Sequence, residues 1–149
     1  MLPGLGMAIG SATGGWLNDR LTTRFGRYIG RCGVASAAIG LAAIFIAVGP
    51  TVDSPRVASV ILAGGAGVLY LAQSSFWSVS ADIAGPSAGA VSGVMNMGAQ
   101  LGGFVTAWMT PLIGEHFGWT RSFFAAAGLC VVGALAWTAV RPDREIVPV

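Results

Sequence analysis

Charged residues divide this sequence into five long apolar stretches, and this division constrains the fold more than any other feature. Of the 149 residues, 54% are hydrophobic and 9% are charged, whereas a soluble domain carries about 25% charged residues. An apolar helix of about 20 residues is long enough to cross the hydrocarbon core of a bilayer. The sequence therefore predicts an all-α polytopic membrane protein with about five transmembrane helices, at about residues 1–17, 32–49, 57–81, 88–114 and 122–140.

Arginines favour one orientation of these helices, because short loops rich in positive charge stay on the cytoplasmic side of a membrane. Alternate loops differ strongly in arginine content. One side would hold Arg20, Arg24, Arg27, Arg31, Arg141 and Arg144, and the other side would hold Arg56 and Arg121. We therefore expect a multi-pass protein of the cell (inner) membrane, with residues 141–149 as a cytoplasmic tail.

The remaining chemistry-bearing residues exclude several classes of function. A net charge of +2 without clustered basic residues argues against nucleic-acid binding. Cys32 and Cys130 lie in apolar stretches without metal-ligand spacing, so we expect both to be small packing residues. His116 follows Glu115 in a predicted loop, where a solvated role is expected. The sequence predicts no enzyme, no catalytic residue and no metal site.

Glycines recur at every fourth position in two parts of the chain. This spacing places small residues on one helix face and lets helix backbones approach closely within lipid. The residues are Gly6, Gly10 and Gly14 in the first stretch, and Gly85, Gly89 and Gly93 around the start of the fourth, where Gly98 and Gly102 repeat the step separately. We expect both sets to be packing surfaces.

Polar side chains within the third and fourth stretches lie at helical spacing. Tyr70, Ser74 and Trp77 follow one stripe, and Ser92, Asn96 and Gln100 recur at steps of four. Each such group needs a partner or water at membrane depth. Two interpretations are open: the two polar faces enclose a shared wet cavity, or they form hydrogen bonds that hold the bundle together.

The loop after the first stretch resembles a known signature. A glycine ends the span, an acidic residue follows four positions later and precedes an arginine, and a second glycine is flanked by arginines; the residues are Gly15, Asp19, Arg20, Arg24, Gly26 and Arg27. This pattern resembles the cytoplasmic signature loop of the major facilitator superfamily, which occurs between helices 2 and 3 and, more loosely, between helices 8 and 9. Gly26 and Arg27 are displaced from the tight form of that pattern.

Two further segments narrow the resemblance. Residues 76–82, 89–98 and 101–103 resemble helices 10 and 11 of the anion:cation symporter branch, which includes sugar-acid and phthalate permeases. The pair Gly118 and Trp119 fits the same branch. The resemblance implies that residues 1–149 are a partial C-terminal six-helix domain, from the end of helix 8 to helix 12. The partners implied are a small organic anion, the lipid bilayer and the missing N-terminal half, which would supply the other wall of a midplane substrate site.

The resemblance also implies roles for individual residues. Trp77, Ser74 and Asn96 match positions that face the substrate cavity, where the indole would stack on the ligand and the polar groups would hydrogen-bond it. Gln73, Gln100 and Tyr70 are further substrate-binding candidates. Asp19 and Arg20 would belong to the conformational switch, with Gly15, Arg24, Gly26 and Arg27 in the same loop. Arg31, at the start of a stretch, is expected to extend toward the membrane surface.

The function expected on this basis is that of a C-terminal fragment of a secondary active transporter. It would take up an organic anion, such as a sugar acid or an aromatic carboxylate, by alternating access. No cofactor is expected, and the proton gradient would be the driving force. The alternatives are a small assembling membrane protein, a remnant without transport activity of its own, and a facilitator that is not coupled to protons.

Overall fold

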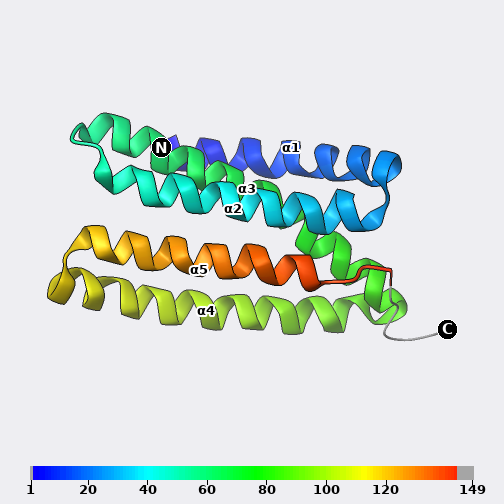
Figure 1. Cartoon of the computed structure of the whole chain (residues 1–149). Coiled ribbons are helices and arrows are strands. Elements are labelled where there is room, and N and C mark those ends of the chain that lie inside the picture. Colours follow the sequence, from blue (N-terminus) through cyan, green and yellow to red (C-terminus); the bar gives the residue numbers. More distant parts are fainter. Residues whose placement is uncertain (1, 144–149) are drawn as a thin grey trace.

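The computed structural model describes residues 2–143 and confirms the all-α class (Figure 1). Met1, where the first predicted span begins, and residues 144–149 of the predicted tail lie outside the described residues. The long helices are α1 (Leu2–Phe25), α2 (Val34–Val48), α3 (Pro55–Ala84), α4 (Ala88–Phe117) and α5 (Trp119–Ala139). A π-helix, η1 (Tyr28–Gly33), leads into α2, and the short 3₁₀ turns η2 (Gly49–Thr51) and η3 (Gly85–Ser87) flank α3.

Three stretches of the described chain are long and apolar enough to cross a membrane: Tyr28–Thr51, Pro55–Phe117 and Trp119–Ala139. The second stretch contains both α3 and α4, which reverse direction at η3 (Figure 1). Helix α1 is not among the three, because its many glycines and its polar C-terminal part lower its apolar content. The arrangement with five crossings stays a prediction.

Most helices extend beyond the predicted spans. Helix α1 continues to Phe25, and α4 continues to Phe117, because backbone hydrogen bonding carries a helix past the end of its apolar residues. Glycines with positive φ then end α1, α3 and α4: Gly26 at 88°, Gly85 at 49° and Gly118 at 93°. Glycine adopts this conformation without the steric cost that a Cβ would add.

Helix α3 is the centre of the arrangement. It packs against α1 and α2, and its C-terminal part packs against α4, while α5 packs against α2 and α4 (Figure 1). The buried cluster where α2, α3 and α5 meet consists of small or branched side chains: Ala35, Ala38, Ile39, Ala72 and Ala134. Small residues at these positions let the helix axes come close together.

The first glycine stripe forms the contact between α1 and α3, as predicted. A Cβ at Gly6 would lie 2.8 Å from the carbonyl oxygen of Ala63, and one at Gly14 would lie 2.5 Å from that of Leu71. Between them, a Cβ at Gly10 would overlap the carbonyl oxygen of Gly67. The two backbones therefore touch directly, and no larger residue fits at the centre of the contact.

The prediction for the second glycine stripe is wrong within the described chain. A Cβ at Gly85, Gly89, Gly93, Gly98 or Gly102 would meet no heavy atom within 4 Å among residues 2–143. The reason is the position of α4, which contacts α5 and the C-terminal part of α3 and leaves its remaining surface exposed. Sequence spacing identified small faces on both helices but could not say which face has a neighbour.

Hydroxyl groups fasten α5 to its neighbours. The Tyr28 hydroxyl donates to the carbonyl oxygen of Thr138 at 2.7 Å, and the Ser36 hydroxyl donates to that of Ala134 at 2.8 Å. At the other end of α5, the Ser122 hydroxyl donates to the carbonyl oxygen of Thr110 at 2.9 Å. These bonds satisfy side-chain donors that would otherwise face an apolar medium.

The two cysteines differ in burial. Cys32 is buried within η1, and Cys130 is half-buried on α5 against the cluster where α2, α3 and α5 meet. Both are free thiols.

The α1–α3 contact predicts a strong difference between two Gly→Ala substitutions. Gly10→Ala should lower the free energy of unfolding by about 1 to 3 kcal/mol, because its Cβ meets the backbone of Gly67. Gly98→Ala is the matched control on α4; it should be neutral or should stabilise by up to about 1 kcal/mol, because alanine favours a helix. Thermal unfolding of the two variants in detergent measures the difference, and equal melting temperatures would contradict the contact.

Candidate substrate cavity

A cavity of about 240 Å³ lies between α3 and α4. It brings together four of the residues that the sequence predicts for substrate binding, namely Tyr70, Gln73 and Trp77 of α3 and Asn96 of α4. Its other lining residues are Leu69, Phe76, Met95 and Ala99. Part of the polar stripe of α3 and one residue of the polar stripe of α4 thus share one space, whereas Ser74, Ser92 and Gln100 do not line it.

Helix geometry and a tight turn create this meeting. Steps of three and four place Tyr70, Gln73 and Trp77 on one face of α3. The turn at η3 then folds α4 back along α3, and the Ser80 hydroxyl of α3 lies 3.2 Å from the sulfur of Met95 on α4. Asn96 follows Met95 directly and reaches the same space as the α3 stripe.

The polar groups of the cavity are available to a ligand. Within residues 2–143, the side chains of Tyr70, Gln73 and Asn96 donate no hydrogen bond to another residue and accept none. Trp77 is 45% exposed, and Asn96 is exposed as well. Direct hydrogen bonding between the two polar faces, the second sequence interpretation, is therefore not what the described residues show.

The chemistry of the wall is aromatic and amide, without charge. Three aromatic rings and two carboxamides line the cavity, and none of the described residues that line it is an Arg, Lys, His, Asp or Glu. Phe76 is held in place by stacking on Trp137 of α5, with ring centroids 4.9 Å apart. This set can stack on a flat or apolar ligand face and hydrogen-bond to its oxygens, but it supplies no counter-charge.

Two predicted substrate residues do not line this cavity. The Ser74 hydroxyl donates to the carbonyl oxygen of Leu71 in its own helix, at 3.2 Å. Gln100 is exposed on α4, one turn beyond Asn96. Phe76, Met95, Leu69 and Ala99 were missed by the sequence analysis, because apolar residues in an apolar helix carry no signal that separates cavity wall from lipid-facing surface.

The predicted switch loop is the exposed end of α1 and the turn after it. Gly26 ends the helix, and Asp19, Arg24 and Arg27 are exposed. The guanidinium of Arg20 lies 5.2 Å from the ring centroid of Trp16, which is a cation–π contact. Gly15 lies within α1.

An ion pair lies near this loop, but its two residues are not among the predicted switch residues. Arg31 Nη1 lies 2.8 Å from Asp82 Oδ2, and their side chains are 17% and 15% exposed. It is the single salt bridge within residues 2–143, and it joins η1 to the C-terminal end of α3. The expectation that Arg31 extends to the membrane surface is therefore wrong, because a carboxylate 51 positions away in sequence meets it inside the bundle.

A buried amide lies close to this ion pair. Asn18 is 1% exposed and Ser75 is fully buried. With its oxygen and nitrogen exchanged, the Asn18 amide donates to the carbonyl oxygen of Gly30 at 2.9 Å and accepts from the backbone N–H of Ser75 at 3.3 Å. We favour this orientation because it satisfies both ends of the amide. Asn18 thus ties α1 to both η1 and α3.

Other polar clusters offer little chemistry. Within residues 2–143, no group of three or more His, Cys, Asp or Glu side chains could hold a metal ion. His116 is exposed, and its Nδ1 lies 3.0 Å from the carbonyl oxygen of Leu112 in the same helix.

Comparison with known proteins gives relatives but no matching family model. The chain is 33% identical over 145 residues to a probable sulfoacetate transporter of Cupriavidus necator, covering 95% of this chain and 33% of that protein. It is 30% identical over 149 residues to the chloroplastic probable anion transporter 1 of Oryza sativa subsp. japonica, covering 99% of this chain and 28% of that protein. It is 29% identical over 149 residues to the chloroplastic sodium-dependent phosphate transport protein 1 of Arabidopsis thaliana, covering 99% of this chain and 29% of that protein.

This chain is similar to anion transporters. The similarity covers nearly all of the chain and confirms the resemblance found in its motifs. The chain spans about a third or less of the length of these relatives. Transporter relatives and long apolar helices together support a membrane protein.

The Arg31–Asp82 pair predicts a large loss of stability when one partner is removed. Asp82→Asn should lower the free energy of unfolding by about 1 to 3 kcal/mol, because a mostly buried guanidinium loses its counter-charge. Asp53→Asn is the matched control, since Asp53 is exposed in the loop before α3. Equal unfolding temperatures for these two variants in detergent would show that the ion pair contributes nothing.

Proposed function

We propose that this chain is the C-terminal part of a secondary active transporter of the major facilitator superfamily, which moves an organic anion across the cell membrane by alternating access. The observation that carries the proposal is the α3–α4 cavity. It unites four residues chosen from the sequence alone, in a chain whose relatives are named as transporters of anions.

The cavity would bind one side of the substrate. Trp77 and Tyr70 would cover its apolar face, and the amide N–H groups of Gln73 and Asn96 would donate to carboxylate or hydroxyl oxygens. A sugar acid or an aromatic carboxylate has both kinds of surface. The named relatives act on phosphate and on sulfoacetate, which also present several acceptor oxygens.

The charge balance indicates what the rest of the transporter must supply. Among residues 2–143, no Arg, Lys or His lines the cavity, yet an anion that leaves water needs a counter-charge or a dense set of donors. We assign that role, and the proton-binding group, to the missing N-terminal half. Proton coupling would then drive uptake without a cofactor, with Asp19 and Arg20 at the cytoplasmic end as part of the switch between the two conformations.

A second candidate function has one observation in its favour. Two glycine pairs on α4, Gly89 with Gly93 and Gly98 with Gly102, each form a small face that has no neighbour among the described residues. A small membrane protein that assembles with itself or with another chain could use such a face. Expression of the chain, alone and together with a separate N-terminal half, separates the possibilities. A defined oligomer of the chain alone favours assembly, and transport restored by the separate N-terminal half favours the transporter. If neither result is obtained, the chain is a remnant.

The proposed site predicts specific losses of substrate affinity in the transporter that carries these residues. Trp77→Ala and Asn96→Ala should each raise KM about tenfold, the effect of losing about 1.4 kcal/mol of contact or hydrogen bonding. Trp108→Ala is the matched control, because Trp108 is an exposed tryptophan on α4 outside the cavity. Uptake of radiolabelled glucuronate, sulfoacetate and phosphate into membrane vesicles with an imposed pH gradient provides the measurement.

Two results would count against this assignment. Equal KM values for Trp77→Ala, Asn96→Ala and Trp108→Ala would remove the cavity from the substrate path. Uptake that is unaffected when a protonophore dissipates the pH gradient would replace symport with facilitated diffusion.

A further inference from the structure

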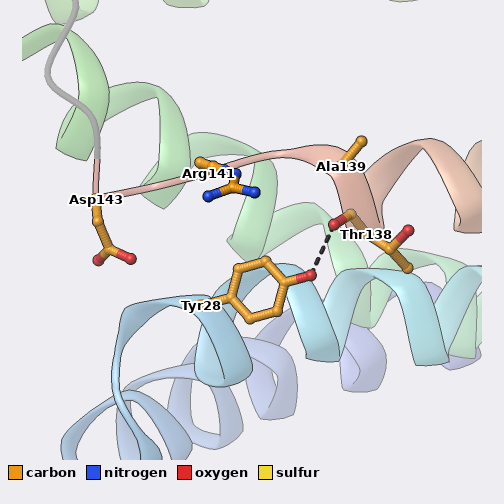
Figure 2. Close-up of a pocket in the computed structure, with 5 residues that line it drawn as sticks. All are labelled: Tyr28, Thr138, Ala139, Arg141 and Asp143. Atoms are coloured by element: carbon orange, nitrogen blue, oxygen red, sulfur yellow. Dashed lines mark hydrogen bonds between the residues drawn. The ribbon is translucent and has the colours of Figure 1, made fainter.

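A second cavity, of about 560 Å³, lies where the end of α5 meets the start of η1 (Figure 2). Its lining residues are Tyr28, Thr138, Ala139, Arg141 and Asp143. It shares no lining residue with the α3–α4 cavity. Its wall differs as well, because the described residues that line it include one cation and one anion.

A hydrogen bond and a buried proline fix the backbone that forms the frame of this cavity. The Tyr28 hydroxyl donates to the carbonyl oxygen of Thr138 at 2.7 Å (Figure 2). Helix α5 ends at Ala139, and Pro142 is fully buried after it. The buried proline anchors the short segment that carries the two charged side chains on either side of it.

The two charges are separated and exposed. Arg141 and Asp143 form no ion pair with each other, and Figure 2 shows their charged ends apart. Both residues are exposed. A net anion would be attracted by Arg141 and repelled by Asp143, whereas a ligand with a negative and a positive group can satisfy both.

The surroundings indicate a ligand that also has an apolar part. Leu135 lies one turn before Thr138 on α5 and is 64% exposed, and Ile29, next to Tyr28, is 51% exposed. The same end of the bundle carries Arg24 and Arg27 beside the turn at Gly26. Charged groups at a helix end, a tyrosine and exposed apolar side chains one turn deeper are the pattern of a membrane interface.

We propose that this cavity binds the headgroup of a zwitterionic phospholipid with a primary ammonium group, of the phosphatidylethanolamine type. The Arg141 guanidinium donates hydrogen bonds to the lipid phosphate, and the ammonium donates to the Asp143 carboxylate. The acyl chains follow the exposed apolar surface of α5 beyond Leu135. Lipid binding at this cavity requires no transport activity and does not depend on the proposed substrate site.

Native mass spectrometry of the purified protein in detergent tests this site. The protein is titrated with phosphatidylethanolamine, phosphatidylcholine and phosphatidylglycerol that have identical acyl chains. Phosphatidylethanolamine should bind about threefold to tenfold more tightly than the other two, the value of one exposed charge-assisted hydrogen bond. Phosphatidylcholine has no ammonium N–H, and phosphatidylglycerol has no cation.

Two variants separate the roles of the charges. Arg141→Gln should weaken binding of phosphatidylethanolamine and phosphatidylglycerol alike, because both lose the phosphate contact. Asp143→Asn should abolish the preference for phosphatidylethanolamine over phosphatidylglycerol and leave phosphate binding in place. The controls are Arg121→Gln and Asp53→Asn, two exposed residues at the opposite ends of α5 and α2, which should change nothing.

Further outcomes decide the identity of the ligand. Soluble phosphoethanolamine has the same headgroup but no acyl chains. If it displaces the lipid at millimolar concentration, the lipid site is overturned and the ligand is a soluble zwitterion. Equal binding of the three lipids, or a loss of preference in the control variants, would overturn the proposal altogether. Tyr28→Phe keeps the ring and removes the bond to Thr138; it should reduce affinity for all three lipids by loosening the frame.

Discussion

The direct backbone contact between α1 and α3 fixes the position of the helix on which the rest of the structure depends. Lipid provides no hydrophobic force between helices, so close packing and buried polar bonds must hold them. The stripe centred on Gly10 and Gly67 provides the packing, and Asn18 adds a buried amide to the same interface. With one face of α3 held in this way, the face with Tyr70, Gln73 and Trp77 is turned toward α4.

Charged side chains and the uncharged cavity wall are separated along α3. Its C-terminal end carries Asp82, which is paired with Arg31, whereas the cavity wall nearer its middle carries aromatic rings and amides without formal charge. An ion pair at the end of the helix stabilises the bundle without placing a fixed charge in the cavity.

Helical periodicity in the sequence predicted which faces of α3 and α4 carry the polar side chains of the cavity. The steps from Tyr70 to Trp77, and the amide at Asn96, identified the two faces that enclose the cavity. The family resemblance places Ser74 before Gln73 as a substrate residue, whereas the structure turns Ser74 to its own backbone and Gln73 to the cavity. Periodicity could not decide between them, because it does not give the direction of the neighbouring helix. The Arg31–Asp82 pair joins residues in separate stretches, and neither its partners nor the open surroundings of the α4 glycines follow from local sequence.

The π-helix η1 has a consequence for tolerance to deletions. A π-turn holds one residue more than an α-turn over the same length of helix, so it absorbs an extra residue between the turn at Gly26 and the start of α2. Deleting one residue there would restore regular α-helix and change the directions in which the side chains inside the turn point, while the segments on both sides keep their orientation. Tyr28 would turn away from Thr138 in the same step as Arg31 turned away from Asp82. The irregular turn therefore sets the register of two separate contacts, and a length change as small as one residue would break both together.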